Sequence, residues 1–160
     1  MSWTGFVDSR LTPYTRDYET CESTHACLRI YPRTETIADV TGTLGVEPTE
    51  ACDKGETIGP NSIGRTRTVK RTVWFLSSEK FVKSNDLRHH LDWVLEKIAT
   101  RERAIRQIQE WDGVKMTLGC SWWSAHGHGG PVVWPEQMEI MARLNLEWSF
   151  EVMFFGDNIL

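Results

Sequence analysis

Two segments near the end of the chain alternate between apolar and polar residues, and a segment of helical pattern lies between them. Such alternation is typical of a β-strand with one face packed on a core and the other open to water or to a partner. The pattern predicts strands over residues 114–123 and 146–155, joined by a glycine-rich loop and a helix that Pro135 begins and Asn145 ends. The apolar positions are Val114, Met116, Leu118, Cys120 and Trp122 in the first strand and Leu146, Trp148, Phe150, Val152 and Phe154 in the second.

Two further strands are predicted in the first half of the chain. Residues 24–31 alternate in the same way, and Pro32 ends the strand because it has no amide hydrogen to donate. Residues 69–77 form another strand, which is apolar on both faces. The sheet therefore has at least four strands.

Helical periodicity follows each of these early strands. Thr34 or Thr36 can cap a helix that begins at about Glu35 and ends before Gly45. The strongest helix begins after Ser84 or Asn85, and its helical pattern continues to about residue 112. Its apolar stripe consists of Leu87, Leu91, Val94, Leu95 and Ile98.

These elements predict an α+β fold with a four- or five-stranded mixed or antiparallel sheet and helices packed on one face. Two βαβ-like halves flank a central helical pair. Residues 1–22 are interpreted as an N-terminal arm and residues 23–160 as a single domain. Residues 46–68 are rich in glycine and proline, and a loop of this length is usually functional, disordered or hiding a short element.

The composition is that of one globular domain, with 160 residues, 40% of them hydrophobic and 25% charged. A net charge of −4 argues against a nucleic-acid binder, because phosphate affinity depends on clustered cations. A short basic run is interpreted as a solvated strand, because threonines are interleaved with it, and RNA binding remains the alternative. This run consists of Arg65, Arg67, Lys70 and Arg71.

The four cysteines show neither a CxxC pair nor zinc-ligand spacing. The chain begins without the pattern of a signal peptide, and no apolar run approaches membrane-spanning length. We therefore expect a cytoplasmic protein with reduced thiols, no bound metal or cofactor, and no membrane contact.

The loop around His126 and His128 is the most conspicuous candidate for chemistry. Two histidines could hold a metal ion, but no further ligand is close in sequence before Glu136. A sharp turn in which three glycines adopt positive φ is the favoured interpretation. No catalytic motif is present elsewhere, and a nucleophile assembled from His25, Cys27 or Ser77 has no support from spacing, so we do not expect an enzyme.

A surface for a protein partner is the remaining functional signal. Trp123 leaves the apolar register of its strand, Trp134 closes the glycine loop, and exposed tryptophans next to acidic loops suit a basic partner. The alternative is that these rings only cap the end of the sheet. The predicted partner-binding residues are Glu47, Glu50, Asp53, Glu56, Trp123, His126, His128 and Trp134.

Several short segments, spread in order over about residues 24–155, carry a family resemblance. They are Leu44-Gly45-Val46-Glu47-Pro48-Thr49 with Lys54-Gly55-Glu56, Trp74-Phe75-Leu76-Ser77-Ser78, Leu91-Asp92-Trp93-Val94-Leu95, the strand ending at Trp122, Gly129-Gly130-Pro131 and the last strand. In these segments the chain resembles a bacterial family described as domain of unknown function 4279. Proteins of this type look similar to immunity proteins encoded beside bacterial toxins, although the resemblance implies no established activity. The long arm and acidic loop depart from a minimal family domain.

Two functions are therefore expected from different classes. The first is a non-enzymatic immunity protein that neutralises a cognate, basic toxin by masking its active site. The second is a small-molecule or metal-binding protein, or an enzyme, with a pocket at residues 126–131 beside Trp74, Trp123, His126 and His128.

Overall fold

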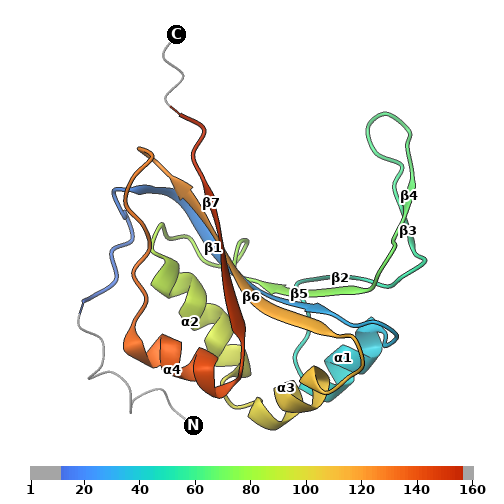
Figure 1. Cartoon of the computed structure of the whole chain (residues 1–160). Helices are drawn as coiled ribbons and strands as arrows, with labels where there is room; N and C mark the ends of the chain where they lie inside the picture. Colours follow the sequence, from blue (N-terminus) through green and yellow to red (C-terminus); the bar gives the residue numbers. More distant parts are fainter. Residues whose placement is uncertain (1–11, 157–160) are drawn as a thin grey trace.

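The computed structural model describes residues 12–156, in which a five-stranded sheet carries every described helix on one face (Figure 1). Neighbouring strands are antiparallel except for the last pair, which is parallel. The α+β fold with a mixed sheet is thus confirmed. The strands lie in the order β2 (Glu50–Cys52), β5 (Val73–Ser77), β1 (Cys21–Tyr31), β6 (Lys115–Ser124) and β7 (Glu147–Met153).

The helical layer consists of α1 (Ile37–Leu44), α2 (Leu87–Ile98), α3 (Glu102–Gln109) and α4 (Pro135–Arg143). Thr36 caps the start of helix α1: its hydroxyl accepts the N–H of Asp39, while the Asp39 carboxylate accepts the N–H of Thr36. The helix ends at Gly45, which has a φ of 70°.

The predicted cap of the central helix is wrong. Asp86, rather than Ser84 or Asn85, precedes α2, and its carboxylate accepts the N–H of Arg88. The Ser84 hydroxyl accepts the N–H of Asp86 instead, so it supports the capping residue from just before the helix.

The core lies between the sheet and the helices, as the alternating patterns predict. Ala26, Leu28 and Ile30 of β1 are fully buried, and so is Trp74 of β5. Cys120 is also buried, which confirms its interpretation as a small core residue. The remaining large core residues are Leu76, Leu87, Leu91, Val94, Leu95, Ile98, Ile105, Ile108, Leu118, Trp122 and Leu144.

The long loop hides three short strands. Besides β2, residues 46–68 contain β3 (Thr57–Ile58) and β4 (Arg67–Thr68), which pair as a hairpin separate from the main sheet. This hairpin projects away from the helices, on the right of Figure 1. Arg65 and Arg67 of the basic run lie on it and are exposed.

The apolar face of the last strand is only half covered, which corrects the expectation of a packed face. Leu146 and Trp148 reach the core, but Phe150 is 40% exposed and Val152 is 66% exposed. The reason is visible in Figure 1, where β7 continues beyond the end of the helical layer.

The described part of the predicted arm packs against the domain. The Thr12 carbonyl oxygen accepts hydrogen bonds from Arg88 Nη1 at 3.2 Å and Trp134 Nε1 at 2.7 Å, and the Tyr14 hydroxyl donates to the carboxylate of Asp92. Residues 1–11 of the arm and the last residues, 157–160, lie outside the described range. Residues 12–20 therefore belong structurally to the domain.

Candidate functional site

The face of the sheet opposite the helices is not covered by any element of the described residues (Figure 1). The strand register places one row of side chains across it, from Glu50 through Phe75, Arg29 and Thr117 to Glu147. We call this surface the open face, defined by the outward residues of the five strands. These are Glu50, Cys52, Val73, Phe75, Ser77, Ser23, His25, Cys27, Arg29, Tyr31, Lys115, Thr117, Gly119, Ser121, Trp123, Glu147, Ser149, Glu151 and Met153.

Aromatic side chains lie toward both ends of the open face. Tyr31 meets the ring of Phe75 edge-on, with centroids 5.6 Å apart, and the guanidinium of Arg71 lies 4.0 Å from the centroid of Tyr31. At the other end, the rings of His25 and Trp123 have centroids 6.0 Å apart. All four rings are partly exposed, so they are available to a binding partner.

Arg29 occupies the centre of the open face. Its guanidinium pairs with Glu151 of β7 at 3.3 Å, and the Arg29 side chain is only 20% exposed. Gly119 and Ser149 are opposite each other in the neighbouring strands, and their small size leaves room for this long side chain. The centre of the open face is therefore polar and lies between two aromatic groups.

The open face also holds the residues considered for nucleophilic chemistry. Cys27 faces Ser77 across the strand pair, but burial raises the pKa of the Cys27 thiol to about 11. Such a thiol stays protonated near neutral pH and is a weak nucleophile. The His25 ring lies 3.2 Å from the Ser121 hydroxyl, and burial lowers the pKa of His25, which favours its neutral form. No activated thiolate lies beside it among the described residues of the open face.

The predicted acidic residues do not form one patch. Glu50 lies on the open face, whereas Glu47 lines a cleft on the helical side. Asp53 accepts the first N–H of α1, from Ile37, and Glu56 accepts the N–H of Asp53. Both of these carboxylates therefore stabilise the turn that leads into the hairpin.

The two predicted tryptophans also separate. Trp123 lies on the open face, partly exposed, as a binding residue must. Trp134 is only 3% exposed, which corrects the expectation of an exposed ring. The cause is the arm, because Tyr14 packs against the indole with centroids 4.7 Å apart and Thr12 accepts its N–H.

The glycine-rich loop forms the turn that the sequence indicates, with one difference. Gly127 and Gly129 adopt positive φ of 75° and 79°, but Gly130 does not. His126 and His128 are exposed and their ring centroids lie 5.8 Å apart. Within residues 12–156, no group of three or more His, Cys, Asp or Glu side chains is arranged to hold a metal ion.

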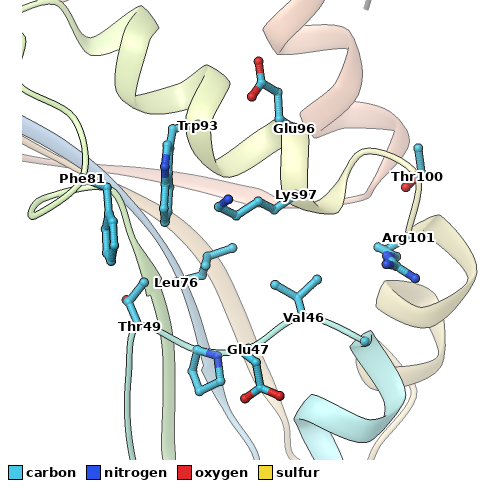
Figure 2. A pocket seen from close by; sticks show the side chains of 12 residues that line it. Val46, Glu47, Thr49, Leu76, Phe81, Trp93, Glu96, Lys97, Thr100 and Arg101 are labelled. Carbon is cyan, nitrogen blue, oxygen red and sulfur yellow. The ribbon is translucent and has the colours of Figure 1, made fainter. Parts of the chain in front are cut away.

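A cleft of about 680 Å³ lies on the helical side of the domain, between the α1–β2 connection and the end of α2 (Figure 2). Phe81 and Trp93 stack on one wall, with centroids 4.9 Å apart, and Lys97 Nζ lies 4.4 Å from the centroid of Trp93. Figure 2 shows Lys97 on the helical side of the cleft, across from Val46.

The charges of this cleft are not neutralised internally. Among residues 12–156, Glu47, Glu96, Lys97 and Arg101 take part in no ion pair. An open cleft with the exposed cations Lys97 and Arg101 beside an aromatic wall can bind a small anion.

The pocket that we expected at the glycine loop does not assemble from its predicted residues. Trp74 is buried in the core and points to the helical side, whereas Trp123 lies on the open face. Neither these rings nor His126 and His128 line the cleft of Figure 2.

Sequence reasoning missed the most prominent residues of both surfaces. Tyr31 and Phe75 form an aromatic pair on the open face. The strand that contains Phe75 is apolar on both faces, and this pattern could have indicated an exposed apolar surface. Phe81 and Trp93 of the cleft come from a loop and a helix, and no periodicity connects them.

Comparisons with known proteins give a family but no named relative. No curated protein and no solved structure matches the chain. Among residues 12–156, no helix has the length and apolar character needed to cross a membrane. A family model, described as a domain of unknown function (DUF4279), matches residues 22–154. This match spans every strand and helix of the main sheet and its helical layer except the first residue of β1, and the chain belongs to the DUF4279 family.

Proposed function

We propose that this protein is a non-enzymatic binding protein that covers a protein partner with its open face. One observation carries the proposal: no helix of residues 12–156 covers this face of the sheet, which bears Tyr31, Phe75 and Trp123 in partly exposed positions. Partly exposed aromatic residues on a preformed surface are the usual centres of protein interfaces.

The charges at the borders of the open face suit a basic partner. Glu50 lies on the edge strand β2 and Glu147 on the edge strand β7, whereas Glu151 is already paired with Arg29 and Lys115 adds one positive charge at the border. Acidic groups around an apolar centre increase the rate of association with a positively charged surface and fix its orientation.

The most concrete form of this proposal is an immunity protein that masks the active site of a cognate bacterial toxin. The resemblance to immunity proteins expected from the sequence is the basis for it, and a surface that is already formed in the single chain can bind with little rearrangement. The four cysteines are free thiols, which suits action in a reducing cytoplasm.

The test is purification of the tagged protein from its native host, followed by identification of a stoichiometric partner. We expect that partner to stop growth when it is expressed alone and to be harmless when this protein is co-expressed. Phe75→Ala and Trp123→Ala should abolish the rescue. Phe81→Ala, which truncates an aromatic residue 59% exposed on the helical side, is the matched control and should preserve it.

Two results would contradict the proposal. One is the absence of any stoichiometric partner in cells that carry the neighbouring genes. The other is a partner whose binding is lost with Phe81→Ala but retained with both open-face variants.

A small-molecule function is the second candidate, and the cleft of Figure 2 is the observation that favours it. Its ligand would be a small anion that binds Lys97 and Arg101 beside the wall formed by Phe81 and Trp93. A thermal-shift screen of aromatic carboxylates and nucleotides tests this. A ligand that stabilises the wild type but neither Trp93→Ala nor Arg101→Ala would support the second candidate.

A further inference from the structure

The outer edge of β7 is unpaired among the described residues. Strand β7 is the last strand of the sheet, its seven residues contain neither proline nor lysine, and its outer backbone groups face no other described strand. Proteins usually protect such an edge with charges, proline or a covering element, because it is a template for pairing with another chain. Here the edge is seven residues long, and it carries exposed Phe150 and Val152 beside two acids, Glu147 and Glu151.

We propose that two copies of this chain pair through β7, antiparallel and edge to edge, with Phe150 at the two-fold axis. This homodimer goes beyond the proposed partner binding and does not depend on it. A two-fold axis perpendicular to the sheet places the helical layers of both copies on the same side of the joined sheet. Each residue of β7 then lies opposite a residue of the second copy whose side chain points to the same face of the sheet.

The register follows from the strand's own pattern. With Phe150 opposite Phe150 of the second copy, all seven residues of β7 are paired, and Trp148 faces Val152. Three apolar pairs thus form on the helical side, where Phe150 is 40% exposed and Val152 is 66% exposed in the single chain. Aromatic and β-branched pairs of this kind are the favourable cross-strand contacts.

The acidic residues exclude the adjacent registers. A two-fold axis at Ser149 would place Glu147 opposite Glu151, and an axis at Glu151 would place that residue opposite itself. Like charges directly opposite each other destabilise a strand pair. With the axis at Phe150, Glu151 faces Ser149 and Glu147 faces Met153, so no acid of β7 faces another acid.

In the single chain, Trp148 already lies where it would contact Val152 of the second copy. Its ring and that of Phe150 lie 4.6 Å apart on the same face of β7, so pairing would bring four aromatic rings into one row. The two sheets would join into one, with both open faces on the same side.

The first test is the mass of the purified protein in solution, measured by sedimentation equilibrium over a concentration series. We expect twice the chain mass of 18.5 kDa for the wild type and a single chain mass for Val152→Lys. Ile63→Lys is the matched control, since Ile63 is 70% exposed on the hairpin, and it should remain dimeric. A monomeric wild type, or a dimer that Val152→Lys leaves intact, would overturn the proposal.

The second test reports the register directly. In a Cys52→Ser background, Phe150→Cys should form a disulfide-linked dimer under mild oxidation, because the two introduced thiols face each other. Val152→Cys should not, although its side chain is more exposed, because it faces Trp148. Mixing Val152→Cys with Trp148→Cys should restore cross-linking between the two variants. Equal cross-linking of Phe150→Cys and Val152→Cys alone would rule out this register.

Discussion

The guanidinium of Arg29 lies over Gly119, in the space that a side chain at Gly119 would occupy. A β-carbon at Gly119 would lie 2.7 Å from Cζ of Arg29, closer than two non-bonded carbons approach. The same guanidinium pairs with Glu151 at 3.3 Å. Glycine at this position therefore allows Arg29 to reach across β6 to the acid on the next strand.

We expect Gly119→Ala to uncouple Arg29 from Glu151 without unfolding the sheet, because the displaced atoms are the flexible end of a side chain. Glu151→Gln should cost about 0.5 kcal/mol in the wild type and close to nothing in the Gly119→Ala background. Urea denaturation of the four proteins in this cycle measures the difference. Glu147→Gln should cost the same in both backgrounds. A cost for Glu151→Gln that is as large in the Gly119→Ala background as in the wild type would refute the coupling.

Removal of Asp86 should destabilise the domain strongly. Its carboxylate is fully buried, pairs with Arg88 Nη2 at 2.6 Å and accepts the N–H of Thr15 from the arm. Asp86→Ala leaves a buried guanidinium unpaired and deletes the cap of α2, which should cost about 3–5 kcal/mol of unfolding free energy.

A surface ion pair provides the comparison for this measurement. Arg33 and Asp112 lie 2.8 Å apart with side chains 64% and 87% exposed, so Asp112→Ala should cost less than about 1 kcal/mol. Equal losses for the two variants in guanidinium denaturation would show that the buried pair is not a principal support of the fold.

Acid should destabilise the protein through its buried histidines. His90 Nε2 lies 2.8 Å from the Ser84 carbonyl oxygen and must donate to it, while Nδ1 lies 2.8 Å from the Ser78 hydroxyl, which is also 3.1 Å from the Ala26 carbonyl oxygen. Burial lowers the pKa of His90 from 6.5, as it does for His25 and His89. The unfolded chain therefore binds protons first, and stability falls as pH drops below 6.5 toward the lowered folded pKa values.

The measurement is the free energy of unfolding at a series of values from about pH 7 to about pH 5. His90→Gln, which can keep one hydrogen bond, should reduce the slope over this range. A profile that is flat below 6.5 in the wild type would contradict the assignment of a neutral, buried His90.

The four thiols should differ sharply in reactivity. Burial raises the pKa of Cys21 and Cys27 to about 11 and that of Cys120 to about 12, whereas Cys52 is the one cysteine that is partly exposed. We expect a maleimide to modify only Cys52 in the native protein, and all four cysteines in urea, as read by mass spectrometry. Rapid native modification of Cys27 would show that the open face is less closely packed than described.

The sequence predicted elements well where one local pattern determines them. Strand β6 alternates and is packed on its apolar side, so Leu118, Cys120 and Trp122 are in the core as expected. Strand β7 has the same pattern, but Val152 is exposed, because the length of the helical layer is a tertiary property that alternation does not encode.

The site was harder to predict than the fold for a similar reason. The sequence predicts Trp134 on the surface, and its burial is explained by the arm, where Tyr14 packs against the ring and Thr12, 122 residues away in sequence, accepts its N–H. The sequence predicts Asp53 as a partner-binding residue. In the structure its carboxylate accepts the N–H of Ile37 at the start of α1, a contact that depends on the path of the chain after β2. Glu50 and Trp123 fall on the open face, and their binding role stays a prediction.

The central place of β1 determines when this protein can fold during synthesis. Its two neighbours, β5 and β6, begin at residues 73 and 115, so no strand of the main sheet has a partner until almost half of the chain has left the ribosome. The longest ladder, between β1 and β6, closes only after residue 124. A nascent chain stalled before that point would expose the apolar residues of β1 and depend on chaperones, and it would become resistant to proteases only late in translation.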